Sequence, residues 1–206
     1  MADFTDIVEN QKEDLEELLS QRVVERSAMS RMELDAPFAQ VAIGVRRSGK
    51  SVVCRTALAR RGEPFGYVNF DDEKLDGIQA SDLDDVLKAV LVVYGPVKRL
   101  FLDEIQDVPS WPLFVNRLLR KGFHVVISGS NARLLSSDLA THLTGRHVAT
   151  EIFPFSFAEY RKYLDRGVPR TTTARAEARR DYDRYLRFGG RLSLEYILLE
   201  GRLQGI

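Results

Sequence analysis

Short apolar runs alternate with longer amphipathic segments along most of this chain. The runs are rich in β-branched and aromatic residues and end in glycine or polar residues, which is typical of buried strands. In the longer segments apolar residues recur at three- and four-residue steps, which indicates helices. This pattern predicts strands within residues 39–45, 64–73, 98–104, 123–130 and 146–153, and helices within 5–26, 51–61, 81–92, 112–121 and 131–143.

The order of these elements predicts the fold class. Strands that alternate with helices and are apolar along most of their length form a parallel sheet with helices on both faces. We therefore expect an α/β protein of three layers, α/β/α, around a parallel five-stranded sheet. The chain divides into an N-terminal helical segment at 1–36, a core at 37–154 and a mostly helical region at 155–206.

Composition and charge narrow the range of partners. The chain has 206 residues, of which 44% are hydrophobic, and a formal net charge of zero, so no overall field favours nucleic acid or an anionic membrane. Acidic residues accompany the arginines after Arg161, which favours a solvated helix face over a nucleic-acid patch. One cysteine, Cys54, excludes an internal disulfide. No apolar run could span a bilayer and no signal peptide is visible, so we expect a cytoplasmic protein.

A glycine-rich loop follows the first predicted strand. Its sequence, "GVRRSGKS", fits the pattern G-x-x-x-x-G-K-[ST]. Glycine permits backbone angles and close approach that a side chain forbids, and the loop N–H groups form an anion site with the helix N-terminus. Lys50 brings a charge to the β- and γ-phosphates, and Ser51 offers a hydroxyl to Mg²⁺. Arg46 and Arg47 face phosphate, solvent or a neighbouring acid. The predicted ATP contacts are Gly44, Val45, Arg46, Arg47, Ser48, Gly49, Lys50 and Ser51.

Two acidic residues end the strand-like run "RLFLDE". In P-loop enzymes an aspartate at this place holds Mg²⁺, so Asp103 is a candidate metal ligand together with Ser51. A glutamate after it, here Glu104, can act as the general base toward water. Because neighbouring strand residues point to opposite faces, both carboxylates reach one site only where the strand ends. The pair favours ATP hydrolysis over phosphoryl transfer to a metabolite, and the alternative is a capped strand with two solvated acids.

A third predicted strand, "FHVVISGSN", also ends in polar residues. Where this strand lies between the strands of the glycine-rich loop and the acidic pair, its polar end faces the γ-phosphate. Asn131 is then the best candidate to orient the attacking water, and Ser130 is the second. A turn or a helix cap is the alternative role for these residues.

Six blocks of the chain resemble, in order and spacing, a group of prokaryotic AAA+-type P-loop ATPases. The blocks are "GVRRSGKS", "YVNFDDE", "LFLDEIQDVPSW", "VVISGSNARLLS", "HLTGRHV" and "EIFPFSFAEY", within residues 40–160. The resemblance implies a Walker A motif at Gly44–Ser51, a Walker B motif at Leu100–Glu104, a sensor at Asn131 and an arginine finger at Arg146. It also implies a sheet order that places the strand before Asn131 beside the nucleotide.

An arginine finger acts mainly across a subunit boundary, so the resemblance implies a homo-oligomer. A solvated surface arginine is the alternative for Arg146. After "YLRFGG", residues 185–190, the chain departs from the group: we expect a short, incomplete helical lid and no C-terminal domain of uncharacterised function. Two other functions stay open. One is a nucleotide-binding switch that binds ATP without turnover, and the other is a DNA-associated accessory ATPase.

Overall fold

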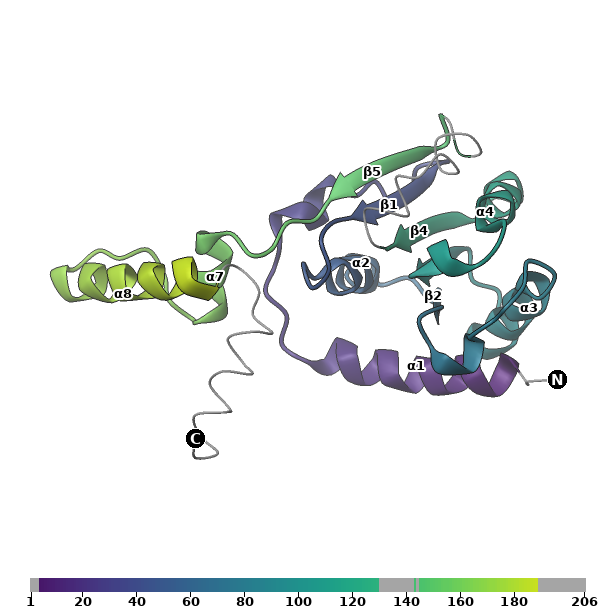
Figure 1. Cartoon of the computed structure of the whole chain (residues 1–206), viewed down its shortest axis with the longest axis horizontal. Coiled ribbons are helices and arrows are strands. Elements are labelled where there is room, and N and C mark those ends of the chain that lie inside the picture. Colours follow the sequence, from purple (N-terminus) through teal and green to yellow (C-terminus); the bar gives the residue numbers. More distant parts are fainter. Residues whose placement is uncertain (1–3, 130–142, 144, 189–206) are drawn as a thin grey trace.

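Five parallel strands form the centre of the protein (Figure 1). The computed structural model describes residues 4–129, 143 and 145–188. The strands are β1 (Ala39–Ile43), β2 (Phe65–Asn69), β3 (Arg99–Asp103), β4 (His124–Ser128) and β5 (His147–Glu151). The α-helices are α1 (Phe4–Ser20), α2 (Lys50–Ala59), α3 (Leu83–Tyr94), α4 (Trp111–Arg120), α7 (Phe157–Tyr163) and α8 (Thr172–Phe188). Short 3₁₀ turns are η1 (Ser27–Arg31), η2 (Glu73–Leu75) and η3 (Ile105–Asp107).

The strand order is β2-β3-β4-β1-β5, and every neighbouring pair is parallel. Strand β2 follows β1 in the chain and lies beyond β4 and β3, whereas β5 follows β4 and lies beyond β1 in the opposite direction across the sheet. In open parallel sheets, ligands bind beyond the carboxyl ends of the strands at such a switch point. The predicted three-layer α/β fold with a parallel five-stranded sheet is confirmed, and it directs attention to the ends of β1, β3 and β4.

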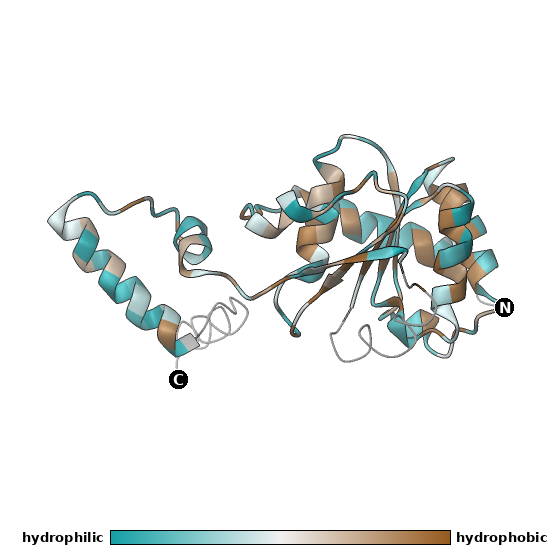
Figure 2. Cartoon of the chain, turned by 90° about the horizontal axis from the view of Figure 1, so that it is seen from above, coloured by the Kyte–Doolittle hydropathy of each residue, from teal (hydrophilic) through white to brown (hydrophobic). Residues whose placement is uncertain are grey.

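Helices cover both faces of the sheet (Figure 2). One core lies under α3 and α4 and includes Val90 and Phe114, while the other lies under α2 and η1 and includes Val53. Helix α1 packs against α3 and β2, and it contributes Ile7 to the first core and Leu15 to the second. The apolar side chains of both strand faces are thereby removed from water, which is the main stabilising contribution to this fold.

The chain after β5 forms a small helical unit beside the sheet, composed of α7 and α8 (Figure 1). Ser156 and Glu159 form a capping box that starts α7. The ring of Phe157 in α7 contacts the rings of Tyr182 and Tyr185 in α8, with centroids 5.1 and 5.6 Å apart.

No helix in the described part of the chain is both long and apolar enough to cross a bilayer. The domain boundaries expected from the sequence stay a prediction.

The helix predicted over residues 5–26 was too long, because α1 ends at Ser20. The apolar spacing continues to Val23, but residues 21–26 are not helical. Arg26 is buried and makes hydrogen bonds to the backbone of distant parts of the chain. These tertiary contacts hold the segment extended and outweigh its local helical pattern.

Candidate functional site

Two glycines shape the P-loop segment, Gly44–Ser51, which connects β1 to α2. A Cβ atom on Gly44 would lie 2.2 Å from the carbonyl oxygen of Ile152, so no side chain fits there. Gly49 caps α2 with φ 89° and ψ 26°, a left-handed conformation that glycine adopts without steric cost. Close approach and an unusual backbone angle thus account for the two glycines of the motif.

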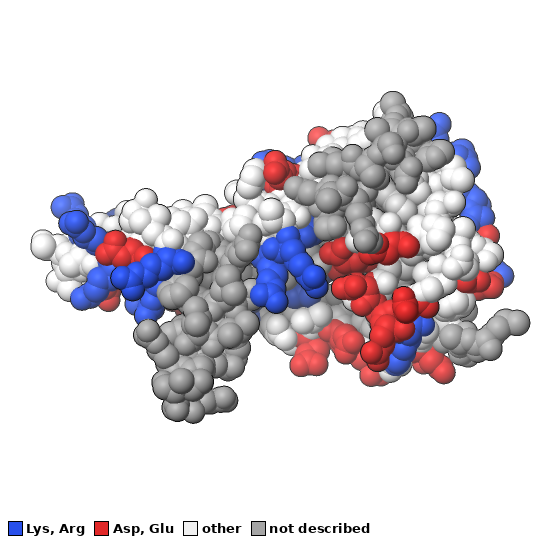
Figure 3. Space-filling model, in the orientation of Figure 1, with Lys and Arg blue, Asp and Glu red and all other residues white. Residues whose placement is uncertain are grey.

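Lys50 begins α2 and directs its amino group back into the P-loop segment. The residue is only 6% exposed, and Nζ donates to the carbonyl oxygens of Gly44 and Val45, both at 3.3 Å. The N-terminus of α2 adds the positive end of a helix dipole at the same place. Arg46 and Arg47 are exposed. Figure 3 shows basic side chains gathered over the loop before α2, with acidic ones adjoining them.

A buried carboxylate at the end of β3 lies beside the P-loop segment. Asp103 is 4% exposed, and its Oδ1 accepts hydrogen bonds from Ser51 Oγ at 3.0 Å and from the hydroxyl of Ser128 at the end of β4. The hydroxyl of Tyr67 donates to Oδ2 at 3.5 Å. Burial raises the pKa of Asp103, and the Ser128 and Ser51 hydroxyls oppose this rise. The structure therefore brings Ser51 and Asp103, the two predicted metal ligands, into contact.

Glu104 turns away from the regular strand direction. Its backbone is left-handed, with φ 53° and ψ 33°, which is uncommon outside glycine and often marks a functional site. Its N–H donates to the carbonyl oxygen of Ser128 at 2.9 Å. Its carboxylate accepts a hydrogen bond from Gln106 Nε2 at 2.7 Å. The alternation of β3 therefore ends at Asp103, which is the condition under which both acids can serve one site.

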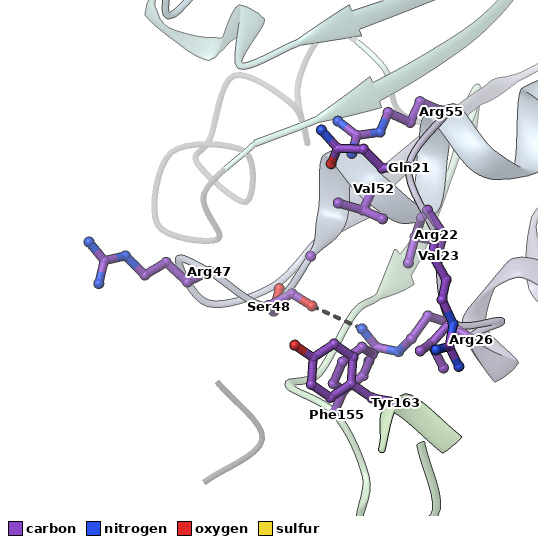
Figure 4. Close-up of a pocket in the computed structure, with 13 residues that line it drawn as sticks. Gln21, Arg22, Val23, Arg26, Arg47, Ser48, Val52, Arg55, Phe155 and Tyr163 are labelled. Carbon is purple, nitrogen blue, oxygen red and sulfur yellow. Dashed lines mark hydrogen bonds between the residues drawn. The ribbon is translucent and has the colours of Figure 1, made fainter. Parts of the chain in front are cut away.

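A cavity of about 410 Å³ opens beside the P-loop segment (Figure 4). It lies among residues 21–26, the start of α2 and the helical unit after β5. Figure 4 shows Gln21 and Arg55 at one side and Phe155 and Tyr163 at another, while Arg47 extends away from them. The apolar part of the lining consists of Val23, Val24, Val52, Val53, Phe155 and Tyr163.

The match to a known family narrows what this site can do. Residues 38–161, which contain all five strands and the P-loop segment, match the family described as AAA domain. The protein belongs to the AAA domain family. The fold of AAA-family P-loop ATPases supports nucleotide binding, and here the cavity and the P-loop segment adjoin each other.

The curated relatives of this AAA-domain protein are named as uncharacterised. A protein of Methanocaldococcus jannaschii is 38% identical over 154 residues, which cover 73% of this chain and 35% of the relative. A protein of Haemophilus influenzae is 39% identical over 135 residues, which cover 61% and 34%. The chain thus spans about a third of the length of these relatives.

Among solved structures, AMPPCP-bound DnaA from Aquifex aeolicus is similar, with a TM-score of 0.51 and 18% identity. The likeness covers 96% of this chain and 60% of DnaA. At this identity it shows the fold alone.

Of the two remaining predicted catalytic residues of this AAA-domain protein, Asn131 and Arg146, the structure describes Arg146. Asn131 and Ser130, with the helix predicted over 131–143 except Leu143, lie outside the described residues. Arg146 is exposed and directly precedes β5, whereas the P-loop segment follows β1. These strands are parallel and in register, so roughly 16 Å of strand separates the two ends. Arg146 therefore lies at the opposite end of the sheet from the P-loop segment of its own chain.

The sequence did not predict the contacts of three residues at this site. Tyr67 and Ser128 contact Asp103, and Gln106 contacts Glu104. Two had a signal in the sequence, because Ser128 ends an apolar run and Gln106 lies two positions after Glu104 in "DEIQD". The contact of Tyr67 follows only from the pairing of β2 with β3, which the local pattern does not specify.

Proposed function

We propose that this AAA-domain protein binds ATP with Mg²⁺ at the P-loop segment and hydrolyses it. The observation that carries the proposal is the 3.0 Å contact between Ser51 Oγ and Asp103 Oδ1, beside the loop that surrounds the ammonium of Lys50. In P-loop ATPases a hydroxyl, an aspartate and a lysine in this arrangement serve the metal ion and the β- and γ-phosphates.

The residues present fit a magnesium ion. Ser51 and Asp103 offer the oxygen donors that Mg²⁺ prefers. Burial raises the pKa of Asp103, so a cation beside this carboxylate stabilises its charged form. When bound, Mg²⁺ neutralises charge on the phosphate oxygens. Ser128 and Tyr67 hold the Asp103 carboxylate in place through Oδ1 and Oδ2, and Oδ1 also contacts Ser51 at the end of the loop.

The cavity beside the P-loop segment suits the nucleoside part of ATP. Val23, Val52 and the ring of Phe155 provide apolar surface against which a planar base can pack. Ser48 and Gly49 of the P-loop segment also line this cavity. A nucleoside bound there has its phosphates directed along the loop toward Lys50.

Hydrolysis requires a base for the attacking water, and we assign this role to Glu104. Its carboxylate accepts a proton as the water oxygen bonds to the γ-phosphorus and the bond to the β,γ-bridging oxygen breaks, which releases ADP and phosphate. Gln106 holds the carboxylate by its 2.7 Å hydrogen bond. We assign the orientation of the water to Asn131, which follows the strand that contributes Ser128.

We further propose that Arg146 acts on the nucleotide of a neighbouring subunit in a homo-oligomer. Its exposure and its place before β5, at the far end of the sheet from its own P-loop segment, favour contact in trans. An arginine from a neighbour stabilises the negative charge of the transition state.

The cytoplasmic location of the protein also stays a prediction.

The proposed function is tested by measuring phosphate release from ATP in the presence of Mg²⁺, for wild type and for Lys50→Ala. We expect release by wild type alone, with a rate per subunit that rises with protein concentration. Calorimetric titration with AMPPCP separates binding from turnover. Binding without release above the Lys50→Ala level would identify a nucleotide-binding switch, and the absence of binding would contradict the whole assignment.

A further inference from the structure

Arg26 reaches the P-loop segment from outside the motif. The residue is 6% exposed. Nη1 donates to the carbonyl oxygen of Ser48 at 3.1 Å, and Nη2 donates to the carbonyl oxygen of Phe153 at 2.7 Å. The guanidinium also lies over the ring of Phe155, 4.5 Å from its centroid. Figure 4 shows the side chain extending from residues 21–26 toward Ser48. One planar group thus joins the P-loop segment to the chain after β5.

Glu159 balances the charge of Arg26 from the start of α7. Nε of Arg26 lies 3.1 Å from Oε1 of Glu159, and the two side chains are 7% and 10% exposed. The other carboxylate oxygen, Oε2, accepts the N–H of Ser156 at 2.9 Å within the capping box. A buried arginine that is paired in this way and shared among several acceptors has one favoured position. The helical unit after β5 is therefore tied to the P-loop segment through a rigid contact.

The Ser48 carbonyl that Arg26 holds belongs to the same peptide unit as the N–H of Gly49. In a planar trans peptide these two groups point in opposite directions, so fixing one fixes the other. Gly49 has φ 89° and offers little resistance to rotation of this peptide, because glycine has many accessible backbone angles. Arg26 supplies the restraint that the glycine lacks. Backbone N–H groups of such loops are the donors that bind phosphate.

We propose that Arg26 is a positioning residue that fixes the Ser48–Gly49 peptide for phosphate binding and couples the P-loop segment to α7 and α8. The inference rests on the proposed ATP site. Phosphate bound at the loop favours the peptide orientation that Arg26 holds. Through Phe153 and Glu159, the same contact favours one placement of the helical unit, so nucleotide binding and that placement stabilise each other.

Two measurements test this coupling in the full chain. The first is the Kd for AMPPCP with Mg²⁺, measured by calorimetry for wild type, Arg26→Ala and Arg26→Lys. The second is the distance between spin labels at Asp183→Cys on α8 and Lys121→Cys after α4, with and without AMPPCP. Both positions are exposed, whereas the native thiol of Cys54 is completely buried and does not compete for label.

We expect Arg26→Ala to raise the Kd for AMPPCP by about tenfold or more, because the variant loses the hydrogen bond to the Ser48 carbonyl and the ion pair with Glu159. Its label distances should be broad and unchanged by AMPPCP, whereas those of wild type should narrow. Arg26→Lys should give partial rescue, because an ammonium can satisfy only part of this set of acceptors. If Arg26→Ala does not fold, Arg26→Lys and Glu159→Gln replace it, with the same direction of effect expected.

Asp165→Asn is the matched control. Asp165 pairs with Arg22 and so links the same two parts of the chain, but this exposed contact does not touch the P-loop segment. Arg22 lines the cavity whereas Asp165 does not, so the substitution leaves every lining residue unchanged. Asparagine tolerates the φ of 58° at this position. The control should keep the affinity and distance response of wild type. If Arg26→Ala or its replacements also match wild type, the inference is overturned while the ATP site stands. If wild type does not bind AMPPCP, the proposed ATP site fails first.

Discussion

The hydroxyl of Ser51 lies 3.0 Å from the carboxylate of Asp103, although 52 positions separate the two residues. This contact joins the first turn of α2 to the end of β3 across the intervening strand β4. It forms because parallel strands deliver their carboxyl ends to one edge of the sheet. Two oxygen donors thereby meet where the P-loop segment holds its lysine.

Replacement of Ser51 tests this contact. Ser51→Ala removes the hydroxyl donor to Asp103 and, in our account, a ligand of Mg²⁺. The affinity for AMPPCP in the presence of Mg²⁺ should fall by about tenfold or more, whereas the affinity measured with EDTA should change little. Ser51→Thr retains a hydroxyl and should bind as wild type does. Equal magnesium dependence in Ser51→Ala and wild type would remove Ser51 from the metal site.

The close approach of Gly44 to Ile152 predicts a cost in stability. An added methyl group on Gly44 would lie 2.2 Å from a backbone oxygen, which cannot move independently of its chain. Gly44→Ala should lower the free energy of unfolding by about 1–3 kcal/mol, a typical effect of overpacking. Gly167→Ala is the control, because nothing lies within 4 Å of the added atom. Denaturant unfolding of the two variants measures the difference, and equal stabilities would contradict the packing argument.

Gln106 should affect turnover more than binding. Its amide holds the Glu104 carboxylate at 2.7 Å, and Gln106 is absent from the lining of the cavity. Gln106→Ala should lower kcat by about tenfold, because one hydrogen bond to a charged group is lost. The Kd for AMPPCP should stay unchanged. The exposed Gln79→Ala serves as the control. A change in Kd with constant kcat would assign Gln106 to binding instead.

Arg146 gives a prediction about assembly. Arg146→Ala should keep the affinity for AMPPCP, but its rate of ATP hydrolysis should fall on the order of a thousandfold, as expected for the loss of an arginine finger. Mixing it with Lys50→Ala should restore part of the rate, because each variant supplies what the other lacks. Phosphate release by the single variants and by their mixture measures this effect. A normal rate for Arg146→Ala alone would leave Arg146 as an exposed surface charge.

Periodicity and motif spacing predicted those parts of the protein that depend on neighbours in the sequence. The strands, the fold class and the P-loop segment follow from apolar runs and from residues within one short loop. The helical pattern failed at residues 21–26, since Arg26 is held there by acceptors far along the chain. The contact of Ser128 with Asp103 requires the pairing of β3 with β4, and the turn at Glu104 requires a backbone angle that no sequence period encodes.

We propose that this site hydrolyses ATP with Glu104 as the base. The most direct test is the rate of phosphate release in a single turnover by Glu104→Gln and by wild type, each in excess over ATP and in the presence of Mg²⁺. Glutamine keeps the size of the side chain but cannot accept the proton. We predict wild-type affinity for ATP and a rate lower by about a hundredfold or more. Equal rates in the two proteins would contradict the claim.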